Sequence, residues 1–281
     1  MSLDNISPKE RQSKSILYVE AVTIPRLNSL MFNPESTWRY IPPIAASGKV
    51  QMAIDRYLLE QHRHGNHPPT LRFYTWQPAA ISLGYHQQEY PPAWNNLTWQ
   101  GEPLEIVRRP TGGRAVLHQG DLTYAIVTSI APGKRLEVYK QLCQFLITGW
   151  RSLGVDLTYG QATKAYIEYA NCFATATGSD LITSAGNKVI GSAQLRRGKT
   201  ILQHGSMLLD TNPQLYRQVF NTNLKQDLRT IIPQDGDRSV AQIIQNLTKA
   251  ALATFKIDIV KQPLSNDEWQ DIASDFSLLR Y

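Results

Sequence analysis

The apolar residues of this chain alternate in short runs that are grouped along the sequence, and this grouping constrains the fold more than any other feature. Residues 71–75, 80–84 and 122–128 have the period of two that is typical of strands. Residues 191–204 have the pattern of a hairpin that turns around Gly198. The runs do not alternate regularly with helices, as the strands of a doubly wound sheet do. The sequence therefore predicts an α+β fold with mixed sheets.

Three segments have the spacing of amphipathic helices. Residues 50–60 follow Ser47, an N-cap candidate, and Asp55 is expected on the polar face of this helix. Residues 136–153 and 240–255 each place their apolar side chains on one face. Short strands and turns are expected from Val155 to Leu209, and the chain beyond Asp210 is expected to be helical.

The composition is that of a soluble globular protein, with 281 residues of which 42% are hydrophobic and 19% charged. No stretch approaches eighteen uncharged apolar residues, so no membrane span is expected. The first 15 residues are polar and mixed in charge, unlike a secretory signal. These features predict a cytoplasmic protein.

The formal net charge of +6 raises the question of an anionic partner. The lysines and arginines are scattered, with no basic helix and no run longer than a pair, so nucleic acid is not expected. A diffuse positive surface would instead steer the approach of an acidic protein.

Residues 108–118, Arg-Arg-Pro-Thr-Gly-Gly-Arg-Ala-Val-Leu-His, place two glycines between arginines and an apolar run. Gly112 and Gly113 can adopt positive φ and let backbone N–H groups approach a bound anion or carbonyl. The three arginines could donate forked hydrogen bonds to a phosphate or carboxylate. The alternative is a plain hairpin turn with exposed arginines. The glycine spacing fits neither a Walker loop nor a dinucleotide-binding fingerprint.

A second block, residues 186–194, delivers one lysine among small residues. Lys188 follows the turn pair Gly186-Asn187 and precedes Gly191-Ser192-Ala193, which leaves room for a ligand. An ammonium held in a pocket can stabilise negative charge that develops on a carbonyl oxygen. The alternative is a solvated hairpin lysine.

The chain has two cysteines, which form no Cys-x-x-Cys pair, and no disulfide framework is expected. Cys143 falls among the core positions of the helix expected over residues 136–153, and a buried structural thiol is the favoured interpretation. Cys172 lies in a loop of small and hydroxyl residues. If Lys188 lies nearby, it would lower the pKa of this thiol and favour the nucleophilic thiolate.

The six histidines give weaker signals. His118 and His204 could act as bases, although a hydrogen-bonded structural histidine is the commoner outcome for each. Three others lie in the polar, proline-bounded residues 61–69, where a solvated loop is favoured over a metal site. No Gly-x-Ser-x-Gly elbow is present to anchor a serine hydrolase triad.

Several motifs occur in order along the chain, and together they resemble the lipoate-protein ligase A and octanoyltransferase superfamily, which shares its catalytic fold with biotin protein ligases. The resemblance covers residues 37–260 and implies an α+β fold that encloses an acyl-binding tunnel. The motifs that carry it are Trp38-Arg39, Met52-Ala53-Ile54-Asp55, Ile81-Ser82-Leu83-Gly84-Tyr85, residues 108–118, Leu122-Thr123-Tyr124, Lys188-Val189-Ile190-Gly191-Ser192-Ala193-Gln194 and His204-Gly205-Ser206.

Within this superfamily the chain is most similar to the cysteine-dependent octanoyltransferases. Cys172-Phe173 matches the Cys-Phe of that branch, whereas Thr177-Gly178-Ser179-Asp180 lacks the arginine of the Gly-Arg-Asn-Asp segment typical of ATP-dependent ligases. The resemblance implies that Cys172 accepts octanoyl as a thioester and that Lys188 polarises the thioester carbonyl. It implies that the acyl group is bound by Arg109, Thr111, Gly112, Gly113, His118, Gly191, Ser192, Ala193, His204 and Gly205.

The resemblance also implies partners and organisation. The donor would be octanoyl-acyl carrier protein, and the acceptor a lysine of a lipoyl domain or of the glycine-cleavage H protein. No cofactor, metal, nucleic acid or membrane is expected, and the protein is expected to be a monomer. Residues 1–36 are interpreted as an N-terminal extension, 37–260 as the catalytic domain and 261–281 as a C-terminal tail. Two alternatives stay open: an ATP-dependent lipoate ligase, which would use ATP and Mg, and a non-catalytic carrier-binding relative.

Overall fold

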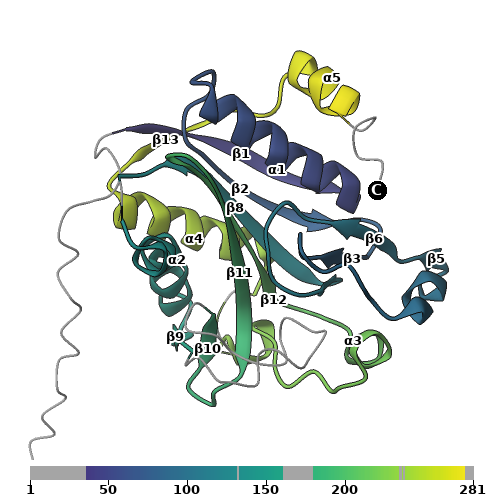
Figure 1. Ribbon diagram of the computed structural model, residues 1–281. Coiled ribbons are helices and arrows are strands. Elements are labelled where there is room, and N and C mark those ends of the chain that lie inside the picture. The colour runs from purple at the N-terminus through teal and green to yellow at the C-terminus, as the bar shows by residue number, and fades with distance from the viewer. Residues whose placement is uncertain (1–35, 132, 161–179, 234–235, 237, 276–281) are drawn as a thin grey trace, which may run out of the picture. The chain divides into compact units, whose positions relative to one another are not determined.

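The computed structural model describes residues 36–131, 133–160, 180–233, 236 and 238–275. These residues form one large mixed sheet and a smaller one, with helices packed against both (Figure 1). The predicted α+β fold with mixed sheets is therefore confirmed.

The large sheet has eight described strands in the order β13-β1-β2-β8-β12-β11-β10-β9. Strand β1 pairs in parallel with both of its neighbours, and every other pair in the sheet is antiparallel. The bounds are β1 Thr37–Ala46, β2 Thr70–Trp76, β8 Asp121–Ser129, β9 Leu157–Tyr159, β10 Leu181–Thr183, β11 Lys188–Arg197, β12 Thr200–Leu208 and β13 Asp258–Lys261. The predicted hairpin is the pair β11–β12, which is joined at Gly198-Lys199.

The two faces of this sheet are covered by different helices because successive strand residues point in opposite directions. Phe73 and Tyr124 face the core formed with α2 (Arg135–Arg151) and α4 (Val240–Phe255). Tyr74 and Ala125 face the core formed with α1 (Gly48–Arg63) on the opposite side (Figure 1). The helix predicted over residues 240–255 is confirmed.

Helix α1 begins at the predicted cap, where the Ser47 hydroxyl accepts a hydrogen bond from the Val50 N–H at 3.4 Å. The prediction that Asp55 lies on the polar face of this helix is wrong. Asp55 and Gln51 are fully buried, four residues apart, on the side that packs against the sheet. Apolar periodicity assigned Asp55 to solvent because it cannot detect a partner on another element. That partner is Arg72 of β2, which forms a buried ion pair with Asp55.

The small sheet places β3 (Ala80–Leu83) between β6 (Glu105–Arg108) and β7 (Val116–His118). Helix α3 (Pro213–Phe220) packs against it through an apolar face. Because β3 separates β6 from β7, residues 109–115 cross over β3, and the hairpin interpretation of this block is wrong. A two-stranded ribbon, β4 (Thr98–Trp99) and β5 (Glu102–Pro103), lies between β3 and β6 in the sequence.

The described residues after Leu209 contain the expected helices, separated by irregular segments, and one strand, β13, which pairs with β1 at the edge of the large sheet. The sequence did not indicate this strand because it is short and mostly exposed, so it lacks alternating burial. Helix α5 (Asn266–Asp275) follows and is held by Glu268, whose carboxylate accepts a hydrogen bond from the buried Arg39 of β1 at 2.8 Å. Arg39 also donates to the carbonyl oxygens of Gln262 and Pro263.

This ion pair predicts a stability effect. We expect Glu268→Gln to lower the free energy of unfolding by about 2–3 kcal/mol, because it leaves a buried guanidinium without its carboxylate. Urea denaturation followed by circular dichroism measures the change. The matched control is Glu60→Gln, which breaks the exposed pair with Arg63 and is expected to cost less than about 1 kcal/mol. Equal effects of the two substitutions would contradict the prediction.

Candidate active site

A cavity of about 400 Å³ lies between the large sheet and the small sheet. Its wall is formed by β2, β8, β11 and β12, by β3 and β7 of the small sheet, by residues of α1 and α2, and by the crossover loop of residues 109–115. Ten of the site residues predicted from the sequence line it: Arg109, Gly112, Gly113, His118, Lys188, Gly191, Ser192, Ala193, His204 and Gly205. Thr111 contacts one of these residues, His204. Blocks separated by up to 96 positions in the sequence are thus brought to one cavity.

Lys188 is the first residue of β11, and its side chain is only 3% exposed. A solvated hairpin lysine is therefore excluded. Its ammonium forms an ion pair with the buried Asp180 at 2.8 Å. Asp180 directly precedes β10, the strand that pairs with β11, so the ladder between the two strands brings the charges together. This pair puts a charged ammonium on the wall of the cavity.

Cys172 lies outside the described residues, and so does Phe173. The second cysteine, Cys143 of α2, is fully buried in the core, as expected from its position in the helix. Burial raises the pKa of its thiol to about 12, although hydrogen bonds with Tyr124 and Ser192 oppose this shift. Cys143 is therefore a neutral thiol at physiological pH and a poor nucleophile.

The glycine pair shapes the crossover loop. Gly113 has a φ of +96°, a backbone conformation that glycine adopts without strain. Gly84, at the end of β3, lies directly against this turn, and a Cβ on Gly84 would overlap the carbonyl oxygen of Gly113. Gly84 and Gly113 are therefore required for the close approach of the loop to β3.

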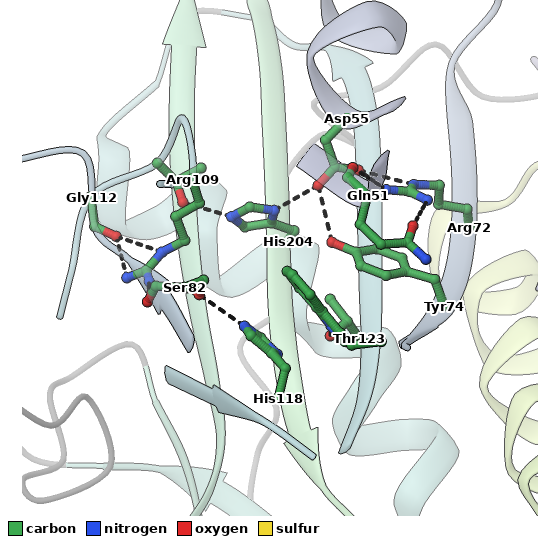
Figure 2. Close-up of polar contacts among 12 residues, drawn as sticks. Gln51, Asp55, Arg72, Tyr74, Ser82, Arg109, Gly112, His118, Thr123 and His204 are labelled. Carbon is green, nitrogen blue, oxygen red and sulfur yellow. Dashed lines mark hydrogen bonds and ion pairs between the residues drawn. The ribbon is translucent and has the colours of Figure 1, made fainter. Parts of the chain in front are cut away.

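Arg109 fixes the same loop from inside. Its buried guanidinium donates to the carbonyl oxygen of Gly112 at 2.8 Å (Figure 2). It also donates to the carbonyl oxygens of Ser82 (2.9 Å) and Arg114 (2.7 Å), and to the Ser82 hydroxyl (3.1 Å). The alternative interpretation of exposed arginines is wrong for this residue. Its geometry organises the loop that forms the cavity wall.

His204 of β12 lies in a chain of buried hydrogen bonds that joins four segments. Its Nε2 is 2.6 Å from the Thr111 hydroxyl, and its Nδ1 is 2.8 Å from the Asp55 carboxylate (Figure 2). Asp55 also accepts hydrogen bonds from Arg72 at 2.6 Å and from the Tyr74 hydroxyl at 3.1 Å. The chain therefore couples α1, β2 and β12 to the crossover loop.

The same contacts determine the charge of Asp55. Burial alone would raise its pKa, but the Arg72 guanidinium and the hydrogen bond from His204 outweigh burial and hold the pKa below its usual value. Asp55 is thus an ionised carboxylate, and its imidazole partner is oriented by an acceptor on one side and a hydroxyl on the other.

His118 of β7 forms a second chain of the same kind. Its Nε2 is 2.8 Å from the Ser82 hydroxyl (Figure 2). Its Nδ1 is 2.8 Å from the Asp121 carboxylate. Trp76 stacks on the imidazole, with ring centroids 3.7 Å apart. Burial lowers the pKa of His118, although the Asp121 carboxylate opposes this shift. The ring is therefore neutral near pH 7, and it presents an aromatic wall to the cavity.

The sequence analysis did not assign Asp55, Arg72, Ser82 and Asp121 to the site. All four are buried. Ser82 and Asp121 are hydrogen-bonded to His118, and Asp55 is hydrogen-bonded to His204. Arg72 reaches the cavity through Asp55, to which it donates. The available signal was a pair of polar residues, Gln51 and Asp55, whose spacing of four positions puts both on one face of the expected helix. The identity of their partners could not be deduced from this spacing.

The described part of the chain lacks two further features. No group of three or more histidine, cysteine, aspartate or glutamate side chains is placed there to hold a metal ion. None of the described helices has the length and apolar character to cross a membrane.

The apolar cavity, its buried lysine and its glycine loop belong to a known class of protein. Residues 47–266 match the family model of the lipoyl protein ligase A/B catalytic domain, and the chain therefore belongs to that family. The family predicted from the sequence motifs is confirmed. The chain is 40% identical to an octanoyltransferase LipM of Carboxydothermus hydrogenoformans, in a match that covers 69% of this chain and 73% of that protein.

Solved structures share the fold. Lipoate-protein ligase A bound with ATP has a TM-score of 0.69 and 20% identity, covering 86% of this chain and 94% of that one. A lipoate protein ligase from Thermoplasma acidophilum, solved as part of a lipoylation system with its E2 lipoyl domain, has a TM-score of 0.66 and 20% identity, covering 87% and 93%. At this identity the likeness shows the fold alone.

The buried neutral His118 predicts a pH dependence of stability. Because its folded pKa is lowered, the unfolded chain binds more protons below pH about 6.5. The stability due to neutral His118 is complete above that pH and is lost as the pH falls toward the folded pKa. We expect the free energy of unfolding to decrease between pH 7.5 and 5.5, and His118→Gln to flatten this slope.

Urea denaturation at a series of pH values measures the slope. His86→Gln is the control, since His86 is exposed, and this variant is expected to keep the slope of the parent protein. An unchanged slope in His118→Gln would show that another group is responsible.

Proposed function

We propose that this enzyme transfers an octanoyl group from acyl carrier protein, through a thioester on Cys172, to a lysine of a lipoyl domain or of the glycine-cleavage H protein. Octanoyl transfer is supported by several relatives named octanoyltransferase LipM, among them proteins 40%, 40% and 36% identical to this chain. The family assignment supports an acyl group as the substrate. The cavity provides an apolar volume for an octanoyl chain.

The observation that carries the proposal is the buried Lys188 on the wall of this cavity. A thioester carbonyl placed beside the ammonium would be polarised, and the oxyanion of the tetrahedral intermediate would be stabilised in a site of low dielectric. The ion pair with Asp180 fixes the position of the lysine side chain on the cavity wall. In the sequence Cys172 is only eight residues before Asp180, so the chain can bring the thiol to the lysine.

The reaction has two acyl transfers. In the first, the Cys172 thiolate attacks the octanoyl carbonyl carbon, the carbon–sulfur bond to the carrier breaks, and the carrier leaves as a thiol after it gains a proton. In the second, the acceptor lysine amine attacks the Cys172 thioester, an amide forms, and the cysteine thiol is regenerated. One thioester is exchanged for another, and amide formation is downhill, so no nucleotide or metal cofactor is required.

The acceptor is inferred from the family. The Thermoplasma acidophilum lipoate protein ligase was solved in a system with an E2 lipoyl domain, which supports a lipoyl domain as the kind of acceptor. We further propose that residues 37–260 form the catalytic domain, with 1–36 as an extension and 261–281 as a tail, and that the protein works as a cytoplasmic monomer. The confirmed family match, residues 47–266, supports a catalytic unit of this size.

The first test is acyl-enzyme formation. We expect the protein to gain the mass of one octanoyl group when it is incubated with octanoyl-acyl carrier protein without ATP. The adduct should be lost in Cys172→Ala and retained in the matched variant Cys143→Ala, because the Cys143 thiol is buried and protonated. Intact-mass spectrometry before and after neutral hydroxylamine, which cleaves thioesters, measures it.

Other outcomes identify the alternatives. Absence of an adduct, together with ATP-dependent labelling of a lipoyl domain, would establish a ligase. Absence of both would indicate a carrier-binding protein without turnover. An adduct that persists in Cys172→Ala would assign the nucleophile to a different residue.

The second test concerns Lys188. Lys188→Arg keeps a cation beside Asp180 but displaces the charge from the carbonyl, and we expect the rate of Cys172 acylation to fall by about 100-fold. Rapid-quench single-turnover measurements give this rate, and thermal unfolding checks that the variant is folded. Lys249→Arg, an exposed substitution on α4, is the control. A rate within a factor of two of the parent would show that Lys188 has only a structural role.

A further inference from the structure

A second cavity, of about 440 Å³, lies beside the first. Its apolar part is formed by Leu59 of α1, Leu195 of β11 and Pro110 of the crossover loop. Tyr85, which follows β3, lines it as well and is 53% exposed, an unusual exposure for a large side chain. Tyrosine and arginine are the residues that protein interfaces favour, so the composition of this cavity is that of a binding surface.

The charged lining of the cavity is mostly positive. Arg56 of α1 and Arg197 of β11 lie at its edge, with Arg108 and Arg109 of the glycine block. The one carboxylate among the lining residues, Glu60, forms an ion pair with Arg63. Arg56 and Arg197 take part in none of the ion pairs found between described residues. An acidic surface would therefore complement this cavity.

The two cavities are continuous along one strand. Alternate residues of β11 face the same side of a sheet, and of these Gly191 and Ala193 line the first cavity, whereas Leu195 and Arg197 line the second. Arg109 lines both cavities. A partner seated on the second cavity is therefore next to the proposed acyl site.

We propose that the second cavity is the docking surface for the acidic carrier protein that donates the acyl group. Acidic side chains of the carrier would contact Arg56, Arg108 and Arg197, and an apolar side chain would pack against Tyr85 and Leu195. The inference rests on the proposed function, because it assumes a carrier-bound donor.

Distance favours the donor over the acceptor. Leu195 is seven residues from Lys188 along β11, which is about 23 Å at 3.3 Å per residue. An acceptor lysine must bring its amine to the thioester beside Lys188, and its own side chain is too short to reach from a domain docked at Leu195. A donor carries its thioester at the end of a long prosthetic arm, which spans such a distance. The second cavity therefore fits the donor.

The test separates carrier recognition from chemistry. In Arg56→Glu/Arg197→Glu, we expect the KM for octanoyl-acyl carrier protein to rise about tenfold or more, with kcat changed less than twofold. Octanoyl-N-acetylcysteamine, a thioester without a carrier, should be used equally well by the variant and the parent. The rise in KM should diminish at high salt, because exposed charges are screened.

Two further pairs of substitutions control for net charge and folding. Arg217→Glu/Lys249→Glu makes the same change in net charge at exposed positions on α3 and α4, and is expected to leave the KM unchanged. Arg56→Gln/Arg197→Gln avoids new repulsion with Glu60 and is expected to raise the KM by a smaller factor. Thermal unfolding of each variant confirms that it is folded.

The outcomes distinguish this inference from the proposed function. If the parent protein takes octanoyl from neither thioester, the proposed function fails and the inference fails with it. If the parent acylates Cys172 normally but the charge-reversed variant keeps the parental KM for the carrier, only the docking surface is wrong. A rise in the KM for the lipoyl-domain acceptor, with no rise for the carrier, would assign the surface to the acceptor and overturn the inference.

Discussion

The buried ion pair between Asp55 and Arg72 is the interaction on which the cavity depends. Both side chains are almost completely inaccessible, and burying two charges costs several kcal/mol unless the remaining lone pairs and protons are also satisfied. The lone pairs of Asp55 are satisfied, because its carboxylate accepts hydrogen bonds from Arg72, Tyr74 and His204. Removing any one partner would leave a buried charge partly compensated. The pair therefore specifies one arrangement of α1 against the sheet, because alternative packings would break these bonds.

This constraint reaches the cavity through His204. Nδ1 of His204 is hydrogen-bonded to the ionised Asp55 carboxylate, and its Nε2 is hydrogen-bonded to the Thr111 hydroxyl. Thr111 belongs to the crossover loop, which Arg109 holds from the other side through three carbonyl oxygens. The loop is thus determined at two points by buried groups. A flexible glycine loop becomes a rigid wall, which is what an enzyme needs in order to position a substrate.

Local patterns predicted the elements, and long-range pairing determined the site. The strands of the sheet and the helix of residues 240–255 were predictable because burial on one face leaves a period in the sequence. The contact of Asp55 with His204 spans 149 positions, and periodicity placed Asp55 in solvent. The motif predicted that Arg109 lies at the cavity, but it did not predict the role of the side chain. The sequence does not distinguish an arginine that binds a ligand from one that donates to the protein backbone. Strand β13 was missed because its exposed side chains leave no alternation.

The charges on the cavity wall bear on the choice between transfer and ligation. A ligase that forms an acyl-adenylate must neutralise phosphate groups, which takes several cations. Among the described residues, three lysine or arginine side chains line this cavity: Arg109, Arg135 and Lys188. Arg109 donates to backbone carbonyls of the crossover loop, and Lys188 is paired with the carboxylate of Asp180. A thioester is neutral and develops a single negative charge, on one oxygen, in the tetrahedral intermediate. One oriented ammonium in an apolar cavity matches that demand, so the electrostatics favour the octanoyltransferase.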